Sequence, residues 1–197
     1  MIYVCVYSGL RVSELIGLKW EDVGPQSLTI DERFCRGDWS VPKTEASAAT
    51  IAVDPSVTAR IQQLKALEVE INWGGKGAKK KFKAVRSSEP TDLVFQSLRN
   101  GGPMNDQNIL RRHLRPAARK LGIDPKKVTW RALRRSWGTW MAQAGADVKS
   151  IQGQMRHSRI GTTMDIYAQF VPEAQQQAVS RTMEMLNDRA KRIAVVN

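Results

Sequence analysis

A histidine and a tyrosine with the potential for chemistry lie near the carboxyl end of the chain, in the stretch RHSRIGTTMDIYAQF. If Ser158 caps a helix there, Ile160, Met164 and Tyr167 fall on one helical face at i, i+4 and i+7. Tyrosines at such spacing are most often packing residues with a hydroxyl at the rim of the core. The alternative is that the Tyr167 hydroxyl is a nucleophile, and the choice depends on which other groups the chain supplies.

A second stretch, TWRALRRSWGTWM, places Arg131, Arg134 and Arg135 at i, i+3 and i+4 of a predicted helix. Three cations on one turn repel each other by a few tenths of a kcal/mol per pair, and a bound anion offsets that repulsion. A solvated arginine cluster is the alternative. Another face of the same helix is apolar and predicts a central place in the core, through Trp130, Leu133, Trp137, Trp140, Met141 and Ala144.

The charge balance indicates a polyanionic partner. The 197 residues include 31 lysines and arginines against 19 aspartates and glutamates, a net charge of +12. Nucleic acid and an anionic membrane surface both fit this charge. We expect nucleic acid, because no apolar run approaches the roughly 20 residues that span a bilayer and the start lacks the features of a signal peptide. Cys5 and Cys35 have no metal-binding spacing, which favours free thiols in a reducing compartment, the cytoplasm.

The spacing of apolar residues predicts an α+β domain that is mostly helical, with one small three-stranded antiparallel sheet. The three strands are expected within residues 27–33, 39–42 and 50–53. An exposed, mobile basic loop is expected over residues 72–92. The predicted helices cover residues 10–18, 54–71, 105–121, 130–144, 148–157, 160–169 and 172–192.

Four segments, in this order, resemble the catalytic domain of the tyrosine recombinase (phage integrase) family. SGLRVSELIGLKW is similar to the family's first arginine box, and PKTEASAATI carries a lysine on the turn between two strands. WRALRRSWGTWM and AGADVKSIQGQMRHSRIGTTMDIY resemble the second arginine box and the tyrosine box. The resemblance runs from about residue 8 to residue 170 and implies the integrase-type catalytic fold.

This resemblance implies roles for individual residues. Arg11 and Arg134 match the two catalytic arginines. Lys43 matches the lysine on the turn, and His157 matches the histidine before the nucleophile. Tyr167 matches the nucleophile itself.

One position departs from the family pattern. The second arginine box usually reads His-x-x-Arg, whereas here Arg131 takes the histidine position ahead of Arg134. An arginine donates hydrogen bonds to phosphate but cannot act as a general base near neutral pH. The change therefore keeps phosphate binding and removes a proton acceptor, so altered activity is expected, with loss as the extreme.

The implied reaction is attack of a tyrosine on a DNA phosphodiester. Guanidinium groups stabilise the charge that develops on the non-bridging oxygens. Nearby cations favour the phenolate of Tyr167, whose free pKa is about 10. The Lys43 ammonium can protonate the leaving 5′-hydroxyl. The product is a 3′-phosphotyrosyl link that conserves the bond energy, so no metal and no cofactor are expected, and no residues have metal-ligand spacing.

Double-stranded DNA is the expected partner, and the resemblance implies a homo-oligomer on it, a tetramer in the family. The segment 172–192 resembles the helix with which family members dock on a neighbouring protomer; a helix packed on its own domain is the alternative. The family's N-terminal DNA-binding domain, and the start of the catalytic domain, are expected to be missing before Met1. Candidate contacts to the DNA backbone are Lys76, Lys79, Lys80, Lys81, Arg111, Arg112 and Arg115.

Three functions stay open on the sequence. The first is a site-specific recombinase or integrase encoded by a bacterium, a phage or a mobile element. The second is a catalytically impaired DNA-binding module derived from a recombinase, which Arg131 favours. The third is a type IB topoisomerase-like enzyme that relaxes DNA through the same covalent chemistry.

Overall fold

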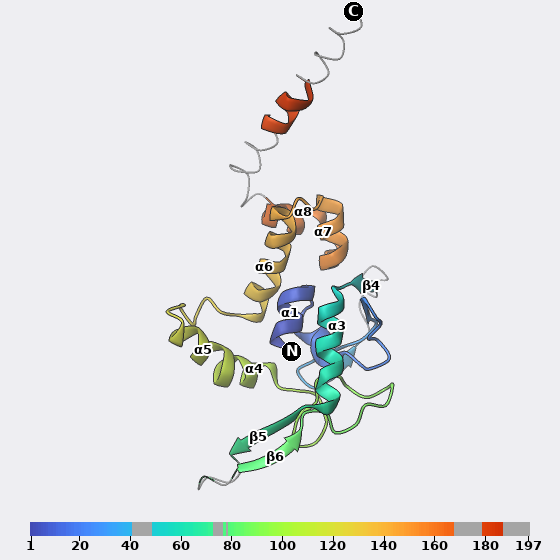
Figure 1. The fold of residues 1–197 in the computed structure, drawn as a ribbon, viewed down its shortest axis with the longest axis vertical. Helices are drawn as coiled ribbons and strands as arrows, with labels where there is room; N and C mark the ends of the chain where they lie inside the picture. Colours follow the sequence, from blue (N-terminus) through green and yellow to red (C-terminus); the bar gives the residue numbers. More distant parts are fainter. Residues whose placement is uncertain (41–48, 73–76, 78, 168–178, 187–197) are drawn as a thin grey trace, which may run out of the picture.

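The fold is known from a computed structural model, which describes residues 1–40, 49–72, 77, 79–167 and 179–186, without the side chain of Tyr167 (Figure 1). The helices are α1 (Ile2–Ser8), α2 (Val12–Gly17), α3 (Pro55–Gln62), α4 (Asp106–Ile109), α5 (Arg115–Lys120), α6 (Trp130–Gln143), α7 (Val148–Met155) and α8 (Ile160–Tyr167), with a 3-10 turn η2 (Gln63–Ala66) and a π-helical turn η3 (Leu110–Leu114). The strands are β1 (Ser27–Ile30), β2 (Arg33–Cys35), β3 (Asp38–Ser40), β4 (Ala49–Ala52), β5 (Glu68–Asn72) and β6 (Lys79–Lys83).

The mostly helical α+β class is confirmed, but the strands of the described part form three separate antiparallel pairs instead of one three-stranded sheet. β1 pairs with β4, β2 with β3, and β5 with β6. The strand predicted over residues 27–33 is divided between β1 and β2. β1 pairs with β4, whereas β2 turns back onto β3 through Arg36 and Gly37, both at positive φ. Such a two-residue turn matches the twist of its own two strands and closes a local hairpin.

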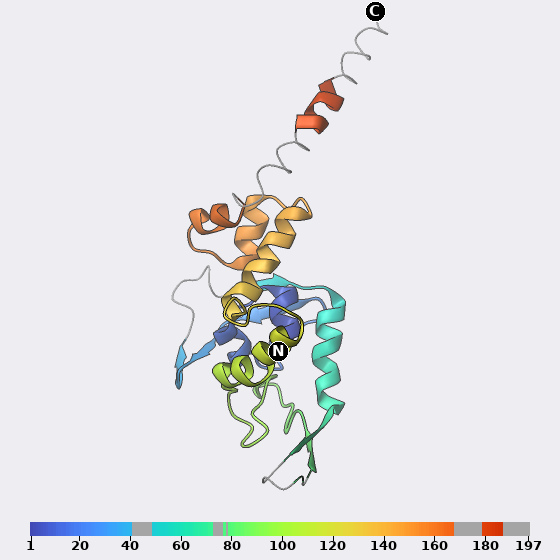
Figure 2. The same cartoon turned by 90° about the vertical axis from the view of Figure 1, so that its left-hand side faces the viewer.

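Two apolar clusters hold the elements together. The larger cluster packs α1, α2 and α3 with the β1–β4 pair, with Val94 and Phe95, and with Trp130 at the start of α6. The smaller cluster contains Ile151, Met155 and Ile166 and joins α7 to α8. Figure 2 shows α6, α7 and α8 stacked together at one end of the body, with α6 running down toward α1. The long helix α6 therefore bridges the two clusters.

Side-chain caps fix where the main helices begin. The Thr129 side chain accepts a hydrogen bond from Ala132 N at 3.0 Å at the start of α6. Asp147 accepts from Ser150 N at 3.0 Å at the start of α7. Such caps satisfy backbone donors that the first helical turn leaves unpaired, which is why both helices begin where their sequences predicted.

The helix predicted over residues 54–71 is wrong in its second half. It ends within η2, and β5 follows from Glu68, where the sequence alternates as Glu-Val-Glu-Ile. This period of two is typical of a strand, and β5 pairs with β6, which starts at Lys79 inside the predicted basic loop. The basic segment is therefore partly a two-stranded ribbon, which projects from the body opposite α6–α8 (Figure 1).

Two predicted apolar faces also differ from the structure. On α6, Trp140 is 45% exposed, so the apolar face is buried mainly toward the start of the helix. On α8, Ile160 and Met164 are exposed, while Thr163 and Ile166 are buried. The buried face of α8 therefore differs from the one that the i, i+4, i+7 pattern predicted, because Ile166 packs with Ile151 and Met155.

Gly9 closes α1 in a conformation that its neighbours require. Its φ is +68°, and an added Cβ would come 2.5 Å from Cδ1 of Trp137. Gly122 has a similar φ of +72°, but an added Cβ there meets no atom within 4 Å. A side chain would therefore meet the same backbone strain at either glycine, whereas the packing around the two glycines differs.

This difference predicts unequal costs for alanine. Gly122→Ala should lower the free energy of unfolding by about 1 kcal/mol through left-handed strain alone. Gly9→Ala should lower it by about 3 kcal/mol, because the clash with the Trp137 ring adds to the same strain. Urea unfolding of both variants measures this, and equal losses would contradict the close packing of α1 on α6.

Candidate active site

Arg11 stands directly before α2, whereas the predicted helix over residues 10–18 included it, and Glu14 in the first turn holds it. The backbone N–H of Arg11 donates to Oε2 of Glu14 at 2.6 Å, and Arg11 Nη1 donates to Oε1 at 2.8 Å. The Glu14 side chain is 6% exposed, whereas that of Arg11 is 39% exposed. The buried Glu14 carboxylate therefore holds the Arg11 guanidinium from its protein side, and the exposed side of the guanidinium is open to a ligand.

Arg134 reaches the same place from α6. Its Nη1 donates to the carbonyl of Gly9 and its Nη2 to the carbonyl of Met155, so this one buried side chain joins α1, α6 and α7. Burial, reinforced by the nearby Arg11 guanidinium, lowers the pKa of Arg134 to about 9. The group stays cationic at neutral pH, and no backbone carbonyl neutralises it.

The turn that ends α7 brings the two arginines together. Arg156 caps this helix with a left-handed backbone, at φ 48°. Its carbonyl accepts a hydrogen bond from Arg11 Nη2 at 3.1 Å, and the preceding carbonyl, that of Met155, accepts from Arg134. Because neighbouring carbonyls of one turn hold both guanidinium groups, the two predicted arginines lie side by side.

His157 follows immediately in this turn. Its backbone N–H donates to the Gln152 carbonyl at 3.1 Å, and its Nδ1 forms a 3.0 Å hydrogen bond with Oγ1 of Thr163 from α8. Partial burial, and then Arg134 and Arg11, lower the pKa of His157 to about 4. The imidazole is therefore neutral at pH 7, and its orientation is fixed by α8, the helix that ends at Tyr167.

The sequence did not identify Glu14 and the Arg156 side chain as members of this site. The Arg156 guanidinium forms an ion pair with Oε2 of Glu14. Burial by itself raises the pKa of Glu14, but Arg156 and Arg11 outweigh it and hold that pKa below its usual value. A signal was present in SELIGL, since an acid amid buried aliphatic residues needs a cationic partner.

The other predicted site residues divide into three cases. Arg131 on α6 is exposed, whereas Arg134, one turn later, is buried. Tyr167 is the last residue of α8, which packs against both α6 and α7. Lys43 lies outside the described residues. The structure therefore brings Arg11, Arg134 and His157 together and leaves the three remaining catalytic assignments, those of Arg131, Tyr167 and Lys43, as predictions.

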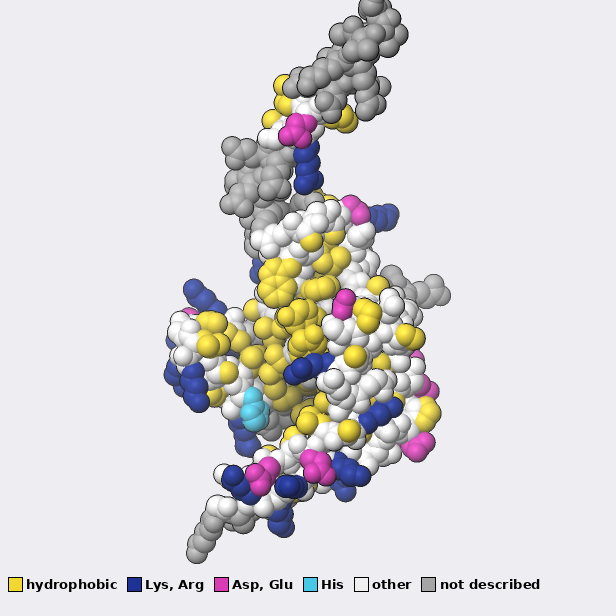
Figure 3. Space-filling model, viewed as in Figure 1, with side chains coloured by type: hydrophobic (Ala, Val, Ile, Leu, Met, Phe, Trp, Pro, Cys, Tyr) yellow, Lys and Arg dark blue, Asp and Glu magenta, His cyan; other side chains and the backbone are white. Residues whose placement is uncertain are grey.

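The predicted DNA contacts lie on two separate projections. Lys79, Lys80 and Lys81 belong to β6, and Lys79 forms a 3.5 Å ion pair with Glu70 of β5. Figure 3 shows acidic and basic side chains mixed on this ribbon and basic side chains around the α4–α5 arm. Two of the arm's predicted residues, Arg111 and Arg112, are exposed, Arg115 is half-buried, and Lys76 lies outside the described residues.

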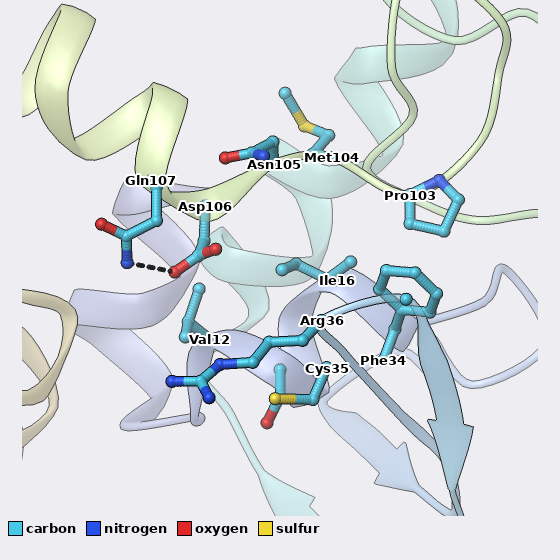
Figure 4. A pocket seen from close by; sticks show the side chains of 12 residues that line it. Val12, Ile16, Phe34, Cys35, Arg36, Pro103, Met104, Asn105, Asp106 and Gln107 are labelled. Carbon is cyan, nitrogen blue, oxygen red and sulfur yellow. Dashed lines mark hydrogen bonds between the residues drawn. The ribbon is translucent and has the colours of Figure 1, made fainter.

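A pocket lies next to the Arg11 end of α2, but neither Arg11 nor Arg134 nor His157 lines it. Figure 4 shows the pocket between α2, the β2–β3 hairpin and the start of α4, with Phe34, Arg36 and Asp106 in its lining. None of the predicted site residues lines it. In the part of the chain that the structure describes, no three or more His, Cys, Asp or Glu residues could hold a metal ion, and no helix is long and apolar enough to cross a membrane.

The environment of His157 predicts a pH effect on stability. Its folded-state pKa of about 4 lies below the unfolded value of about 6.5, so the unfolded chain binds more protons between these pH values. The contribution of His157 to stability is complete above pH 6.5 and is lost as the pH falls toward 4. Urea unfolding should show that the wild type loses its advantage in unfolding free energy over His157→Gln as the pH falls from 6.5 to 4. The same free-energy difference at every pH would contradict the lowered pKa of His157.

The chain is similar in sequence to proteins of one known family. The family model described as the phage integrase family matches residues 1–173. The tyrosine recombinase XerD of Rickettsia bellii is 30% identical over 168 residues, which cover 83% of this chain and 48% of the relative. XerD of Halalkalibacterium halodurans is 28% identical over 185 residues, covering 88% and 54%. The chain thus spans about half the length of these relatives.

Solved structures show the same fold. The Tn1549 transposon integrase, in complex with transposon right end DNA, superposes with a TM-score of 0.71 at 22% identity, over 91% of this chain and 57% of that chain. The XerA recombinase superposes with a TM-score of 0.60 at 22% identity, over 91% and 55%. The family model covers most of the chain, and it does so over the segments that gather the arginines. The chain therefore belongs to the phage integrase family.

Proposed function

We propose that this chain carries the catalytic centre of a site-specific DNA recombinase or integrase, which cuts and rejoins DNA through a covalent 3′-phosphotyrosine. The observation that carries the proposal is the convergence of Arg11, Arg134 and His157 on one turn. The two guanidinium groups and the imidazole can each donate hydrogen bonds to phosphate oxygens, and they meet at this turn. The curated relatives named as tyrosine recombinases support the same reaction class.

In this proposal the two arginines act on one phosphate. Arg11 and Arg134 each use two donors on the protein and retain further N–H groups for the non-bridging oxygens. Neither can shift away as charge develops, because carbonyls and Glu14 already fix them. Such preorganised donors stabilise a transition state without reorganisation. Neutral His157 adds a third donor or acceptor through Nε2, since Nδ1 is engaged by Thr163.

Tyr167 is the nucleophile in this proposal, and Lys43 protonates the leaving 5′-hydroxyl. The phenolic oxygen forms a bond to phosphorus while the bond to the 5′-oxygen breaks. Rejoining reverses these events with the 5′-hydroxyl of a second strand. The cations of Arg11 and Arg134 favour the phenolate of an approaching tyrosine. Arg131 would supply a phosphate contact and no general base.

Duplex DNA is the substrate in this proposal. The exposed Arg111 and Arg112 on the α4–α5 arm, together with Lys80 and Lys81 on the ribbon, would neutralise backbone phosphates. The reaction would run in the cytoplasm, where Cys5 and Cys35, both free, stay reduced.

Assembly on DNA would use the segment after α8. Residues 179–186 are helical and expose Val179, Met183 and Leu186 at i, i+4 and i+7. Figures 1 and 2 draw this helix well away from the body. An apolar stripe that its own domain leaves uncovered favours docking on a neighbouring protomer of a homo-oligomer.

The test uses a pool of nicked duplexes with randomised sequence around the nick. The wild type should form a covalent protein–DNA adduct on a denaturing gel. Tyr167→Phe should form none, while its affinity for the duplex changes by less than about threefold, because the hydroxyl reacts and does not anchor the backbone. Tyr7→Phe, a change at an exposed tyrosine of α1, is the matched control and should react as the wild type does.

Each other outcome has a definite meaning. An adduct formed equally well by Tyr167→Phe would overturn the proposal. Duplex binding without any adduct would identify a catalytically impaired DNA-binding module. An adduct accompanied by plasmid relaxation, but by no strand exchange, would identify a topoisomerase-like enzyme.

A further inference from the structure

The most buried cation of the site is one that neither the predicted roles nor the proposed mechanism uses. The Arg156 side chain is 1% exposed and lies against Glu14, which is 6% exposed. Its Nε and Nη1 are also buried and meet no hydrogen-bond partner among the described residues. A buried guanidinium is costly to desolvate, so the Glu14 carboxylate is the group that compensates it.

Glu14 divides its two oxygens between two arginines. Oε1 accepts from Arg11 Nη1 at 2.8 Å, and Oε2 forms the ion pair with Arg156. Oε2 also accepts the Arg11 backbone N–H at 2.6 Å. With Oε2 held from the other side, the carboxylate cannot rotate without breaking a buried contact. The orientation of Arg11 therefore depends on the side chain of Arg156.

The main chain of Arg156 acts on the same arginine. Its carbonyl accepts from Arg11 Nη2 at 3.1 Å, so Arg11 is fixed on Nη1 through Glu14 and on Nη2 through Arg156 itself. The left-handed backbone at φ 48° is uncommon for a residue with a side chain. An arginine kept in this conformation, with its guanidinium buried, indicates that the side chain has a function in the turn.

We propose that Arg156 is a positioning residue for the phosphoryl transfer: its buried guanidinium locks Glu14, and Glu14 in turn aims Arg11 at the phosphate. This inference rests on the proposed function, since it assigns a role within that same site. Arg156 itself touches neither DNA nor the nucleophile in this assignment. Its effect on the reaction is exerted through Arg11.

Two substitutions separate the side chain from the turn. Arg156→Gly removes the guanidinium but accepts the left-handed φ without strain, so the carbonyls of Met155 and Arg156 stay in place. Arg156→Lys retains a buried positive charge without the planar fork. Arg99→Met, at an exposed arginine outside the site, is the matched control.

Adduct formation on nicked duplexes is the first readout. Arg156→Gly should slow it on the order of 100-fold, because a slightly misaimed clamp loses about that factor. Duplex affinity should change by less than about threefold. Arg156→Lys should recover part of the rate, and Arg99→Met should match the wild type. A wild-type rate for Arg156→Gly would overturn the inference.

A double-mutant cycle tests whether Arg156 acts through Glu14. In a Glu14→Gln background the lock is already broken, so adding Arg156→Gly should slow the reaction by less than about threefold further. Independent structural damage would instead multiply the two losses. Multiplicative losses would therefore also overturn the inference.

The pH profile is a readout that a merely structural role would not move. Glu14 is faced by Arg11 from α2, Arg156 from α7, Arg134 from α6 and the Cys5 thiol from α1. Burial raises the pKa of Cys5 to about 12, so that thiol is neutral. Removing Arg156 leaves burial opposed by fewer cations, which raises the pKa of Glu14. The acid limb of the adduct rate should shift to higher pH in Arg156→Gly, and an unmoved limb would contradict the lock.

Failure of the proposed function is distinguishable from failure of this inference. If the wild type forms no adduct with any nicked duplex, the proposed function fails. Urea unfolding then still tests the ion pair between Arg156 and Glu14. Arg156→Gly should lower the unfolding midpoint when it is introduced into the wild type, and should lower it much less when it is introduced into the Glu14→Gln variant. Equal shifts in both backgrounds would overturn the lock independently of any activity.

Discussion

The arrangement of the candidate active site depends on the C-terminal end of α7. Two neighbouring carbonyls, at Met155 and Arg156, accept hydrogen bonds from Arg134 and Arg11. The last carbonyls of a helix have no intrahelical partner and carry partial negative charge, so they are suitable anchors for cations. Two guanidinium groups that would repel each other in isolation are thereby held together. The resulting concentration of positive charge fits a group with two negatively charged or partly charged oxygens, which a phosphodiester provides.

The rest of the fold serves this helix end. α1 must approach α6 closely so that the Gly9 carbonyl can meet Arg134, and a side chain at Gly9 would collide with Trp137. α8 packs against α7 through Ile166 and Met155. This packing places Oγ1 of Thr163 at hydrogen-bond distance from His157. The same packing carries the chain to Tyr167 at the end of α8. The positions of the proposed nucleophile, of His157 and of Arg134 therefore depend on one small apolar cluster.

The sequence identified residues whose chemistry appears in order along the chain, and it missed those defined by backbone conformation. Arg11, Arg134 and His157 lie in recognisable segments, and capped starts at Thr129 and Asp147 made α6 and α7 predictable. The left-handed turn at Arg156 leaves no periodic signal. Its bonds to Arg11 and Arg134 join residues that lie far apart in the sequence, and no local pattern shows them.

The errors in the fold have a similar origin. The β5–β6 ribbon has few buried residues, so its charged, alternating sequence looked like a helix end followed by a loop. On α8 the spacing of Ile160, Met164 and Tyr167 was compatible with an amphipathic helix, yet the space next to Met155 selected Ile166 instead. The periodicity of a segment predicts that one face of its helix is apolar, but tertiary packing decides which face becomes buried.

Arg11 and Arg134 are proposed to act together on one phosphate while the end of α7 holds them. A crystal structure of the Tyr167→Phe chain with a short nicked duplex tests it most directly. We expect a phosphate at the nick within about 3 Å of both guanidinium groups, with Arg11 and Arg134 still bound to the carbonyls of Arg156 and Met155. A nick phosphate contacted by neither arginine, or arginines released from those carbonyls, would contradict it.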